Sequence, residues 1–242
     1  MSALAHINPL GALRSLFYPA LCAVCSESAG DDQYLCEKCQ RRASRITPPF
    51  CAKCSEQFPG SITQEFTCAN CEGRALHFDS AVSAYRSRGL VRELVHQFKY
   101  GRQRYLRHPL AAWLVETLDD PRLRGRHFDC VVPVPLHSAR ERERGFNQAT
   151  LLAELLSQRI AVPLRPVLER IRYTTTQTAY DRAERMENLH DAFRLRKNAN
   201  VRELHVLLID DVLTTGSTLS ECARVLKMGG AISVHAATAA RA

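Results

Sequence analysis

The chain has no apolar run long enough to cross a bilayer, and it carries no clear signal for secretion. An apolar stretch at residues 10–21 is too short for a membrane span and contains Arg14 and Pro19. The same stretch lacks a small-residue cleavage site of the kind that ends a signal peptide. We therefore expect a cytoplasmic protein without stable membrane insertion.

Within residues 10–21, apolar side chains recur at the spacing of one helical face, at Leu10, Leu13, Leu16 and Phe17. This spacing predicts one amphipathic helix packed on the cysteine-rich segment that follows. Contact of the apolar face with a membrane surface is the alternative.

Basic residues outnumber acidic ones, and the formal net charge is +8. If eight cysteines bound two Zn²⁺ ions as thiolates, this surplus would fall to about +4. The protein remains basic, which favours an anionic partner, either a phosphorylated metabolite or nucleic acid. The 242 residues, 45% of them apolar, suffice for one domain of about 160 residues and a smaller module.

The cysteines locate the smaller module, because eight of the ten lie between positions 22 and 71. They form four C-x-x-C pairs: Cys22 with Cys25, Cys36 with Cys39, Cys51 with Cys54, and Cys68 with Cys71. Two residues between thiolates let both sulfurs reach one tetrahedral ion, so four pairs predict two structural Zn²⁺ sites without an open position. The pattern leaves open whether consecutive or interleaved pairs share an ion.

A disulfide framework is the alternative reading of these eight cysteines. Metal thiolates are favoured, because nothing in the chain indicates secretion and a reducing cytosol disfavours disulfides. The remaining cysteines, Cys130 and Cys222, lie in apolar strand and helix patterns, and we expect them in the core. We place the N-terminal helix and zinc-binding domain at residues 1–75 and a second domain at residues 76–242.

After the cysteines, strand and helix patterns alternate as in a doubly wound parallel α/β sheet. Apolar segments typical of strands occupy residues 78–85 and 130–135. Helical periodicity covers residues 89–98, 110–118 and 148–159.

Residues 205–218 place a strand, an acidic pair and a small-residue loop in succession. The apolar run at 206–209 is typical of a strand buried on both faces, and a helix is expected to begin near Leu219. Free amides and the helix dipole favour phosphate at such a helix start, and Gly216 lets the backbone approach the anion. Asp210 and Asp211 would lie at the ligand-binding edge of the sheet, where vicinal hydroxyls or Mg²⁺ are suitable partners. An ordinary capped turn is the alternative.

Three arginines crowd the segment that follows the strand at 130–135. An extended backbone would place Arg140, Arg142 and Arg144 on one side, where guanidinium groups could bind pyrophosphate. The alternative is a solvated loop whose charges neutralise one another.

The strand, the acidic pair and the sequence T-T-G-S-T resemble the motif that binds 5-phosphoribosyl 1-pyrophosphate (PRPP) in type I phosphoribosyltransferases. The resemblance implies an α/β, type I phosphoribosyltransferase-like domain in which Asp210 and Asp211 hold the ribose hydroxyls as catalytic residues. It also implies that the loop cradles the 5′-phosphate through Thr214, Thr215, Gly216, Ser217 and Thr218.

Over nearly its full length the chain resembles the ComF family, competence-associated proteins with a zinc domain before a phosphoribosyltransferase-like domain. The resemblance includes the C-x-x-C pairs, residues 98–100, the arginine segment, residues 172–193 and the PRPP loop. Lys99 and Tyr100 could contact an anion or a base, or pack at a helix end. Arg182 and Arg185 could share a helical face and bind anions, or belong to a solvated helix surface.

The resemblance implies binding of Mg-PRPP and single-stranded DNA, with a role in DNA uptake and natural transformation. Proteins of the DNA-uptake machinery are further expected partners. The alternative is an active phosphoribosyltransferase that transfers phosphoribose from PRPP with Mg²⁺ to an acceptor that no segment identifies.

Overall fold

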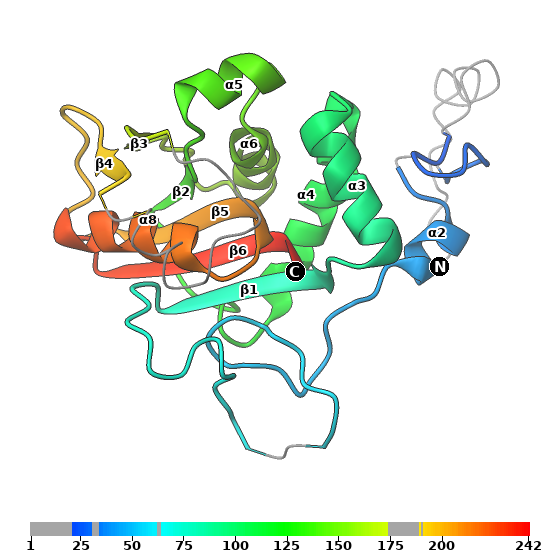
Figure 1. The fold of residues 1–242 in the computed structure, drawn as a ribbon, viewed down its shortest axis with the longest axis horizontal. Helices are drawn as coiled ribbons and strands as arrows, with labels where there is room; N and C mark the ends of the chain where they lie inside the picture. Colours follow the sequence, from blue (N-terminus) through cyan, green and yellow to red (C-terminus); the bar gives the residue numbers. More distant parts are fainter. Residues whose placement is uncertain (1–20, 31–33, 62–63, 174–188, 190) are drawn as a thin grey trace, which may run out of the picture. The chain divides into compact units, whose positions relative to one another are not determined.

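The computed structural model describes residues 21–30, 34–61, 64–173, 189 and 191–242. The chain divides into two compact units, residues 1–43 and 44–242 (Figure 1). The first unit contains α2 (Glu37–Arg42), and the second contains the main sheet. The helix expected at residues 10–21 and the residues Arg182 and Arg185 lie outside the described residues. The expected domain boundary after residue 75 stays a prediction.

The main sheet has four parallel strands in the order β1-β6-β5-β2. These strands are β1 (Ser80–Arg86), β2 (Cys130–Pro133), β5 (His205–Leu213) and β6 (Ser233–Arg241). Residues 206–209 of β5 are fully buried, as expected for a strand covered on both faces.

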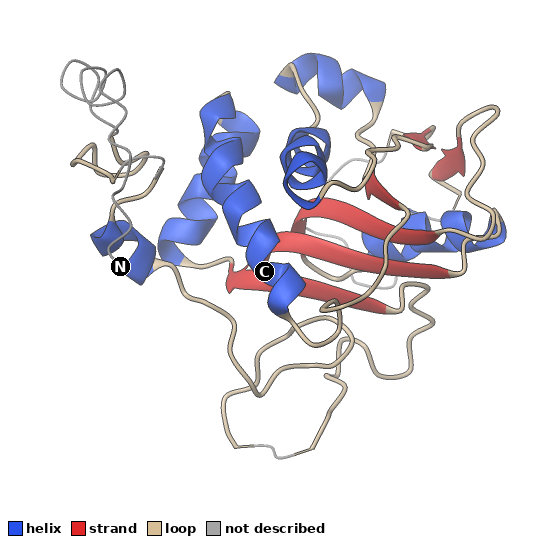
Figure 2. Ribbon diagram, turned by 180° about the vertical axis from the view of Figure 1, so that it is seen from behind, coloured by secondary structure: helices blue, strands red, loops and turns tan. Residues whose placement is uncertain are grey.

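Helices cover both faces of this sheet, so the expected doubly wound fold is confirmed. α4 (Arg107–Glu116) and α6 (Gln148–Ile160) pack on one face, and α8 (Ser217–Met228) lies on the other (Figures 1 and 2). α3 (Gly89–Tyr100) lies beside α4, and short 3-10 turns at Arg104–Leu106 and Thr117–Asp119 flank α4. No helix in the described part of the chain has the length and apolar character needed to cross a membrane.

Sequence periodicity located the predicted helices and the strands β1 and β2 to within two or three residues, whereas β5 continues four residues beyond the expected run at 206–209 and β6 was not predicted. α3 buries the predicted apolar positions Leu90, Val91, Leu94, Val95 and Phe98. α8 begins at Ser217, two residues before the expected start, because Gly216 adopts a left-handed conformation (φ +79°) that sets the helix boundary. Cys130 and Cys222 are fully buried, which confirms their expected place in the core.

The arginine segment differs from expectation, because residues Ser138–Arg144 form a short helix, α5, rather than an extended loop. The His137 side chain caps its start by accepting a hydrogen bond from Ala139 N (3.2 Å). Left-handed Gly145 (φ +81°) ends it. Farther along, β3 (Leu168–Arg170) and β4 (Phe193–Leu195) form an antiparallel pair outside the main sheet.

The second group of four cysteines belongs to the core of the larger unit. Cys51, Cys54 and Cys71 are buried in one cluster with Phe78 and the inner side of α8. This segment therefore shares one hydrophobic core with α8.

Candidate ligand-binding site and cysteine clusters

The candidate ligand site lies where β5 extends beyond its neighbour β2. Pro133 is the last residue of β2 and pairs with Ile209, directly before the acidic pair. Proline has no N–H with which to continue the ladder, and pairing ends there after Val134 N donates to Ile209 O (2.9 Å). The carboxyl end of β5 is thus open on the β2 side, at the edge where open α/β sheets bind ligands.

Asp210 and Asp211 have different surroundings, because adjacent residues of a strand project to opposite faces. Asp211 faces α3, where its Oδ2 lies 3.0 Å from Lys99 Nζ. Only 6% of the Asp211 side chain and 23% of the Lys99 side chain are exposed, so this ion pair is shielded from solvent. Lys99 is therefore held by a site carboxylate, and its contact with a ligand anion stays a prediction.

Burial and the charge of Asp211 raise the pKa of Asp210 to about 7, despite the opposing charge of Lys99. Burial alone would lower the pKa of Lys99, but the charges of Asp211 and Asp210 raise it. Near neutral pH the site therefore holds a protonated lysine and, in Asp210, a carboxyl group close to the midpoint of its titration.

Residues 214–218 comprise a short loop, 214–216, and the first two residues of α8, and their polar groups surround the start of that helix. Thr215 Oγ1 lies 3.0 Å from Ser217 Oγ, and it accepts a hydrogen bond from Ser217 N (3.4 Å). Ser220 N donates to Gly216 O (2.8 Å) and begins the helical ladder. Among the described residues, the N–H groups of Gly216, Thr218 and Leu219 have no recorded acceptor. This is the donor set that an anion at a helix start requires.

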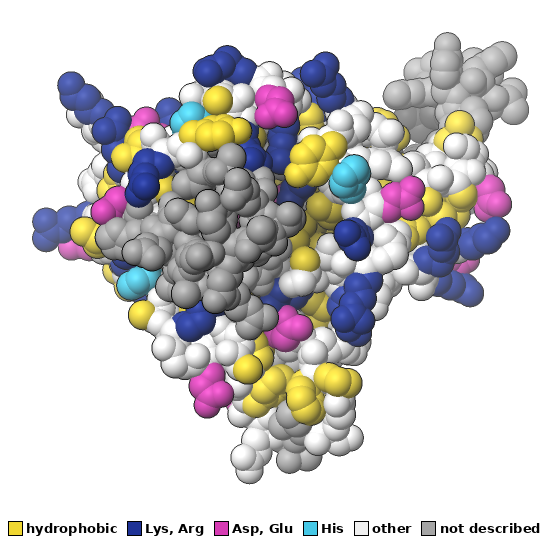
Figure 3. Space-filling view, viewed as in Figure 1, with side chains coloured by type: hydrophobic (Ala, Val, Ile, Leu, Met, Phe, Trp, Pro, Cys, Tyr) yellow, Lys and Arg dark blue, Asp and Glu magenta, His cyan; other side chains and the backbone are white. Residues whose placement is uncertain are grey.

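The helical form of α5 changes which arginines act together. Arg140 and Arg144 are four residues apart and share one face, whereas exposed Arg142 lies on another side. The expected common side for all three was wrong, because it assumed the two-residue period of an extended chain. Lys and Arg side chains project over α5 at the top of Figure 3.

Aromatic rings accompany the two arginines that share a face. The Arg144 guanidinium lies 4.9 Å from the ring centre of Tyr100, and that of Arg140 lies 5.6 Å from Tyr173. Tyr100 and Tyr173 are 60% and 51% exposed, so their rings remain accessible. We call these four residues the arginine–tyrosine surface.

Sequence reasoning missed two arginines near this site. Arg170 lies at the end of β3. Burial lowers its pKa, the nearby charge of Arg140 lowers it further, and the charge of Asp210 raises it. Arg74, three residues after Cys71, donates to Thr215 O (2.8 Å) and to Ser217 Oγ (3.2 Å). Neither residue belongs to a recognisable motif, and only the tertiary fold brings them to the loop.

The eight clustered cysteines form two groups of consecutive pairs. One contains Cys22, Cys25, Cys36 and Cys39, and the other contains Cys51, Cys54, Cys68 and Cys71. In each group the four sulfurs lie within 4.8 Å of one another. The separations Cys25–Cys36 (3.5 Å) and Cys54–Cys68 (3.6 Å) are close to the roughly 3.8 Å expected between sulfurs on a tetrahedral Zn²⁺ ion.

The two groups repeat one backbone pattern. Cys22 N donates to Glu27 O and Cys51 N donates to Glu56 O, both at 2.8 Å. In each, the serine after the second cysteine is left-handed, with φ of +59° at Ser26 and +61° at Ser55. Two four-cysteine sites of this form fit a double zinc ribbon that binds Zn²⁺.

The thiol electrostatics of the second group also fit a bound cation. Hydrogen bonds from Cys54 and Cys71 lower the pKa of Cys51, whereas the Cys51 thiolate raises the pKa of Cys54 to about 12. A thiolate at Cys51 therefore opposes ionisation of Cys54 and Cys71, whose pKa values are both raised. A divalent cation supplies the charge needed for all four to act as thiolate ligands.

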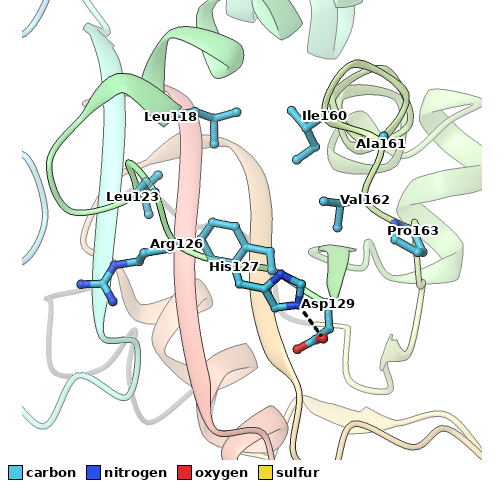
Figure 4. A pocket seen from close by; sticks show the side chains of 11 residues that line it. Leu118, Leu123, Arg126, His127, Asp129, Ile160, Ala161, Val162 and Pro163 are labelled. Atoms are coloured by element: carbon cyan, nitrogen blue, oxygen red, sulfur yellow. Dashed lines mark hydrogen bonds and ion pairs between the residues drawn. The ribbon is translucent and has the colours of Figure 1, made fainter.

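A cavity of about 540 Å³ opens at the opposite end of β2, away from the acidic pair. Figure 4 shows Leu118, Ile160 and Val162 around it, with His127 and Asp129 at one side. Asp129 already accepts hydrogen bonds from His205 N (2.7 Å) and, when His127 Nε2 carries its proton, from that ring (3.0 Å). The carboxylate is thus used to tie β5 to the residue before β2.

The fold and the site define a phosphoribosyltransferase-type domain preceded by a double zinc ribbon. The double zinc ribbon domain family matches residues 13–72, and the phosphoribosyl transferase domain family matches residues 147–242. Competence protein F of Haemophilus influenzae is 31% identical over 86% of this chain and 90% of its own length. Competence protein ComFC of Bacillus subtilis is 32% identical over 87% of this chain and 85% of its own. The chain belongs to the ComF family.

The chain is also similar to two other proteins. The DNA utilization protein YhgH of Escherichia coli K12 is 31% identical over 89% of this chain and 87% of its own length. Among solved structures, adenine phosphoribosyltransferase from Thermoanaerobacter pseudethanolicus is 19% identical, with a TM-score of 0.35 over 55% of this chain and 67% of that chain.

We expect Asp210→Asn to raise the free energy of unfolding at pH 8 by about 2 kcal/mol. The folded-state pKa of about 7 lies above the usual value of 3.8, so the ionised carboxyl destabilises the folded protein above pH 7. This penalty decreases as pH falls from 7 towards 4, and the difference between variant and native protein should decrease with it. Urea unfolding of the variant and of the native protein, followed by circular dichroism at pH 5 and pH 8, measures this difference in the free energy of unfolding at each pH.

Asp211→Asn is the matched comparison and should act in the opposite direction. It leaves Lys99 largely buried without its partner, a change that typically costs about 3–5 kcal/mol. Equal destabilisation by both substitutions at both pH values would contradict the electrostatic assignment.

Proposed function

We propose that this protein binds Mg-PRPP at the carboxyl end of β5, binds single-stranded DNA nearby, and acts in DNA uptake. The observation that carries the proposal is the loop at residues 214–218, which combines hydroxyl groups with amides that lack acceptors among the described residues. A phosphate monoester would satisfy these donors at the positive end of the α8 dipole.

Each part of PRPP has a partner at this edge of the sheet. The loop holds the 5′-phosphate, and Asp210 and Asp211 accept hydrogen bonds from the ribose hydroxyls. Arg140 and Arg144 bind the pyrophosphate through their guanidinium groups, with Arg142 in a lesser role on the other side of α5. Mg²⁺ neutralises part of the pyrophosphate charge when the ligand is bound.

The proposed DNA contact is the arginine–tyrosine surface, which shares Arg140 and Arg144 with the pyrophosphate contact, so the two ligands compete for these side chains. Arginines bind the phosphate backbone, and exposed aromatic rings such as Tyr100 and Tyr173 can stack on unpaired bases. The names of the relatives, competence protein F and DNA utilization protein YhgH, support a role in DNA uptake. Proteins of the uptake machinery are proposed partners on the same grounds.

Isothermal titration of Mg-PRPP into the zinc-loaded protein tests the donor site. We expect saturable binding in the native protein and at least a tenfold loss in the Asp210→Asn/Asp211→Asn double variant, because each lost bond to a charged group contributes about 1.5–3 kcal/mol. Circular dichroism should show that the double variant is folded. Absence of binding by the native protein would refute the PRPP proposal.

Fluorescence anisotropy with a labelled oligonucleotide tests single-stranded DNA binding. Affinity should fall steeply with rising salt and should fall about tenfold in Arg144→Ala, with a similar loss in Tyr100→Ala. Arg142→Ala removes the same charge from another side of α5 and should change affinity less than threefold. Equal effects of the two arginine variants would indicate attraction by net charge rather than a defined surface.

Catalytic phosphoribosyl transfer is the second candidate, favoured by the acidic pair and the cations around it. Pyrophosphate leaves the anomeric carbon as an acceptor attacks, and Lys99, Arg140 and Arg144 could stabilise the developing charge. We expect PRPP-dependent pyrophosphate release with some nucleobase, amine or nucleic acid, lost in the double aspartate variant. Release from none of these acceptors, together with tight PRPP binding, would leave binding as the function.

A further inference from the structure

The second four-cysteine group is connected by hydrogen bonds to residues 214–218, which we call the phosphate loop. Arg74 Nη1 donates to the backbone oxygen of Asn70 (2.9 Å) and to Thr215 O (2.8 Å), while Nη2 donates to Ser217 Oγ (3.2 Å). Asn70 lies between Cys68 and Cys71, and its Nδ2 also donates to Thr215 O (3.4 Å). One guanidinium therefore joins a zinc-ribbon turn directly to the loop.

The bond to Thr215 O fixes the direction of a loop amide. In a planar trans peptide, the C=O of one residue and the N–H of the next point in opposite directions. Because Arg74 and Asn70 hold the Thr215 carbonyl on their side, the Gly216 N–H points away from them. That N–H has no recorded acceptor among the described residues, so it remains available to a ligand on the opposite side of the loop.

The zinc-ribbon turn can act as a fixed support because the second group is itself anchored in the larger unit. Arg122 donates to Cys51 O (3.2 Å), Ala52 O (3.1 Å) and Ser55 Oγ (2.9 Å). Ser55 Oγ in turn donates to Ala81 O on β1 (3.1 Å). The first group, by contrast, lies in the separate unit at residues 1–43.

We propose that the two zinc-ribbon sites have different roles, and that the second one positions the phosphate loop through Asn70 and Arg74. Arg74 is a positioning residue: it holds the peptide between Thr215 and Gly216 in the orientation that presents N–H groups to phosphate. Its positive charge behind the loop also favours the anion. Loss of metal at the second site would release the turn that carries Asn70 and, with it, the loop. The expected effect on PRPP affinity rests on the proposed function, whereas the expected effect on the order of the loop does not.

Hydrogen exchange of the ligand-free, zinc-loaded protein tests the positioning role without PRPP. In Arg74→Ala, the amides of Ser220 and the next two residues should exchange about tenfold faster, because the start of α8 loses the two hydrogen bonds that Arg74 donates to Thr215 O and Ser217 Oγ. Arg74→Lys keeps the charge but not the fork and should exchange as fast as the alanine variant. Arg159→Ala removes an exposed arginine from the end of α6 and should leave these rates unchanged. Full restoration by lysine, or unchanged rates in Arg74→Ala, would overturn the proposal.

Cysteine variants test the difference between the two sites. Cys68→Ser should accelerate exchange at the start of α8 and lower the zinc content, whereas Cys36→Ser should lower the zinc content only. Acceleration by both variants, or by neither, would overturn the assigned division of roles. If Cys68→Ser fails to fold, the Arg74 variants decide the positioning role. The division of roles between the two zinc sites is then decided by comparing zinc chelation from the folded native protein with zinc chelation from Cys36→Ser.

Titration with Mg-PRPP separates this inference from the proposed function. Arg74→Ala should weaken PRPP binding about tenfold, as expected for disordered donors at a charged ligand. No PRPP binding by the native protein, with accelerated exchange in Arg74→Ala, would refute the proposed ligand and support the positioning role. Native binding with neither change in Arg74→Ala would refute the positioning role alone.

Discussion

Two carboxyl groups at the end of a strand buried on both faces are the constraint around which the site is arranged. Ionised carboxylates are costly to bury, and the strand sends Asp210 and Asp211 to opposite faces. Lys99 offsets the charge of Asp211 at 3.0 Å. Asp210 is compensated less completely, and its pKa is raised to about 7. Such a charge pattern is of little use to a purely structural turn, but it suits a site whose ligand supplies hydroxyl groups and a cation.

The proposed anion-binding half of the site depends on backbone geometry more than on side-chain charge. Gly216, with φ of +79°, allows the chain to turn sharply from β5 into α8. The turn leaves the first amides of α8 without acceptors among the described residues, while Arg74 and Asn70 occupy the carbonyl on the other side. In the peptide between Thr215 and Gly216, the carbonyl thus accepts hydrogen bonds from the protein, while the N–H on the opposite side is left for a ligand. Arginines of α5 then add charge where a second phosphate group would lie.

Local sequence patterns were sufficient to predict a helix or strand where the pattern lies within that one element. The apolar run of β5 and the helical period of α3 were identified correctly, whereas the helix after the loop begins two residues earlier than expected. They failed at α5, because alternating Arg and Glu residues satisfy a two-residue period as readily as a helical one, and the His137 cap with Gly145 decided the outcome. Arg74 and Arg170 were missed because their partners are distant in the sequence. The separation between Arg74 and Ser217 is 143 residues, and no local pattern encodes such a contact.

The two cysteine groups show how one local motif acquires different roles from its surroundings. Both have the same C-x-x-C-S turn, the same 2.8 Å backbone hydrogen bond and the same left-handed serine. The second group is packed into the core beside Phe78 and is held there by Arg122. In the second ribbon, Ser55 Oγ accepts from Arg122 and donates to Ala81 O, so the turn is tied to β1. The same four-cysteine motif thus lies in the separate unit at residues 1–43 in one case and, in the other, is bonded through Asn70 and Arg74 to the loop before α8.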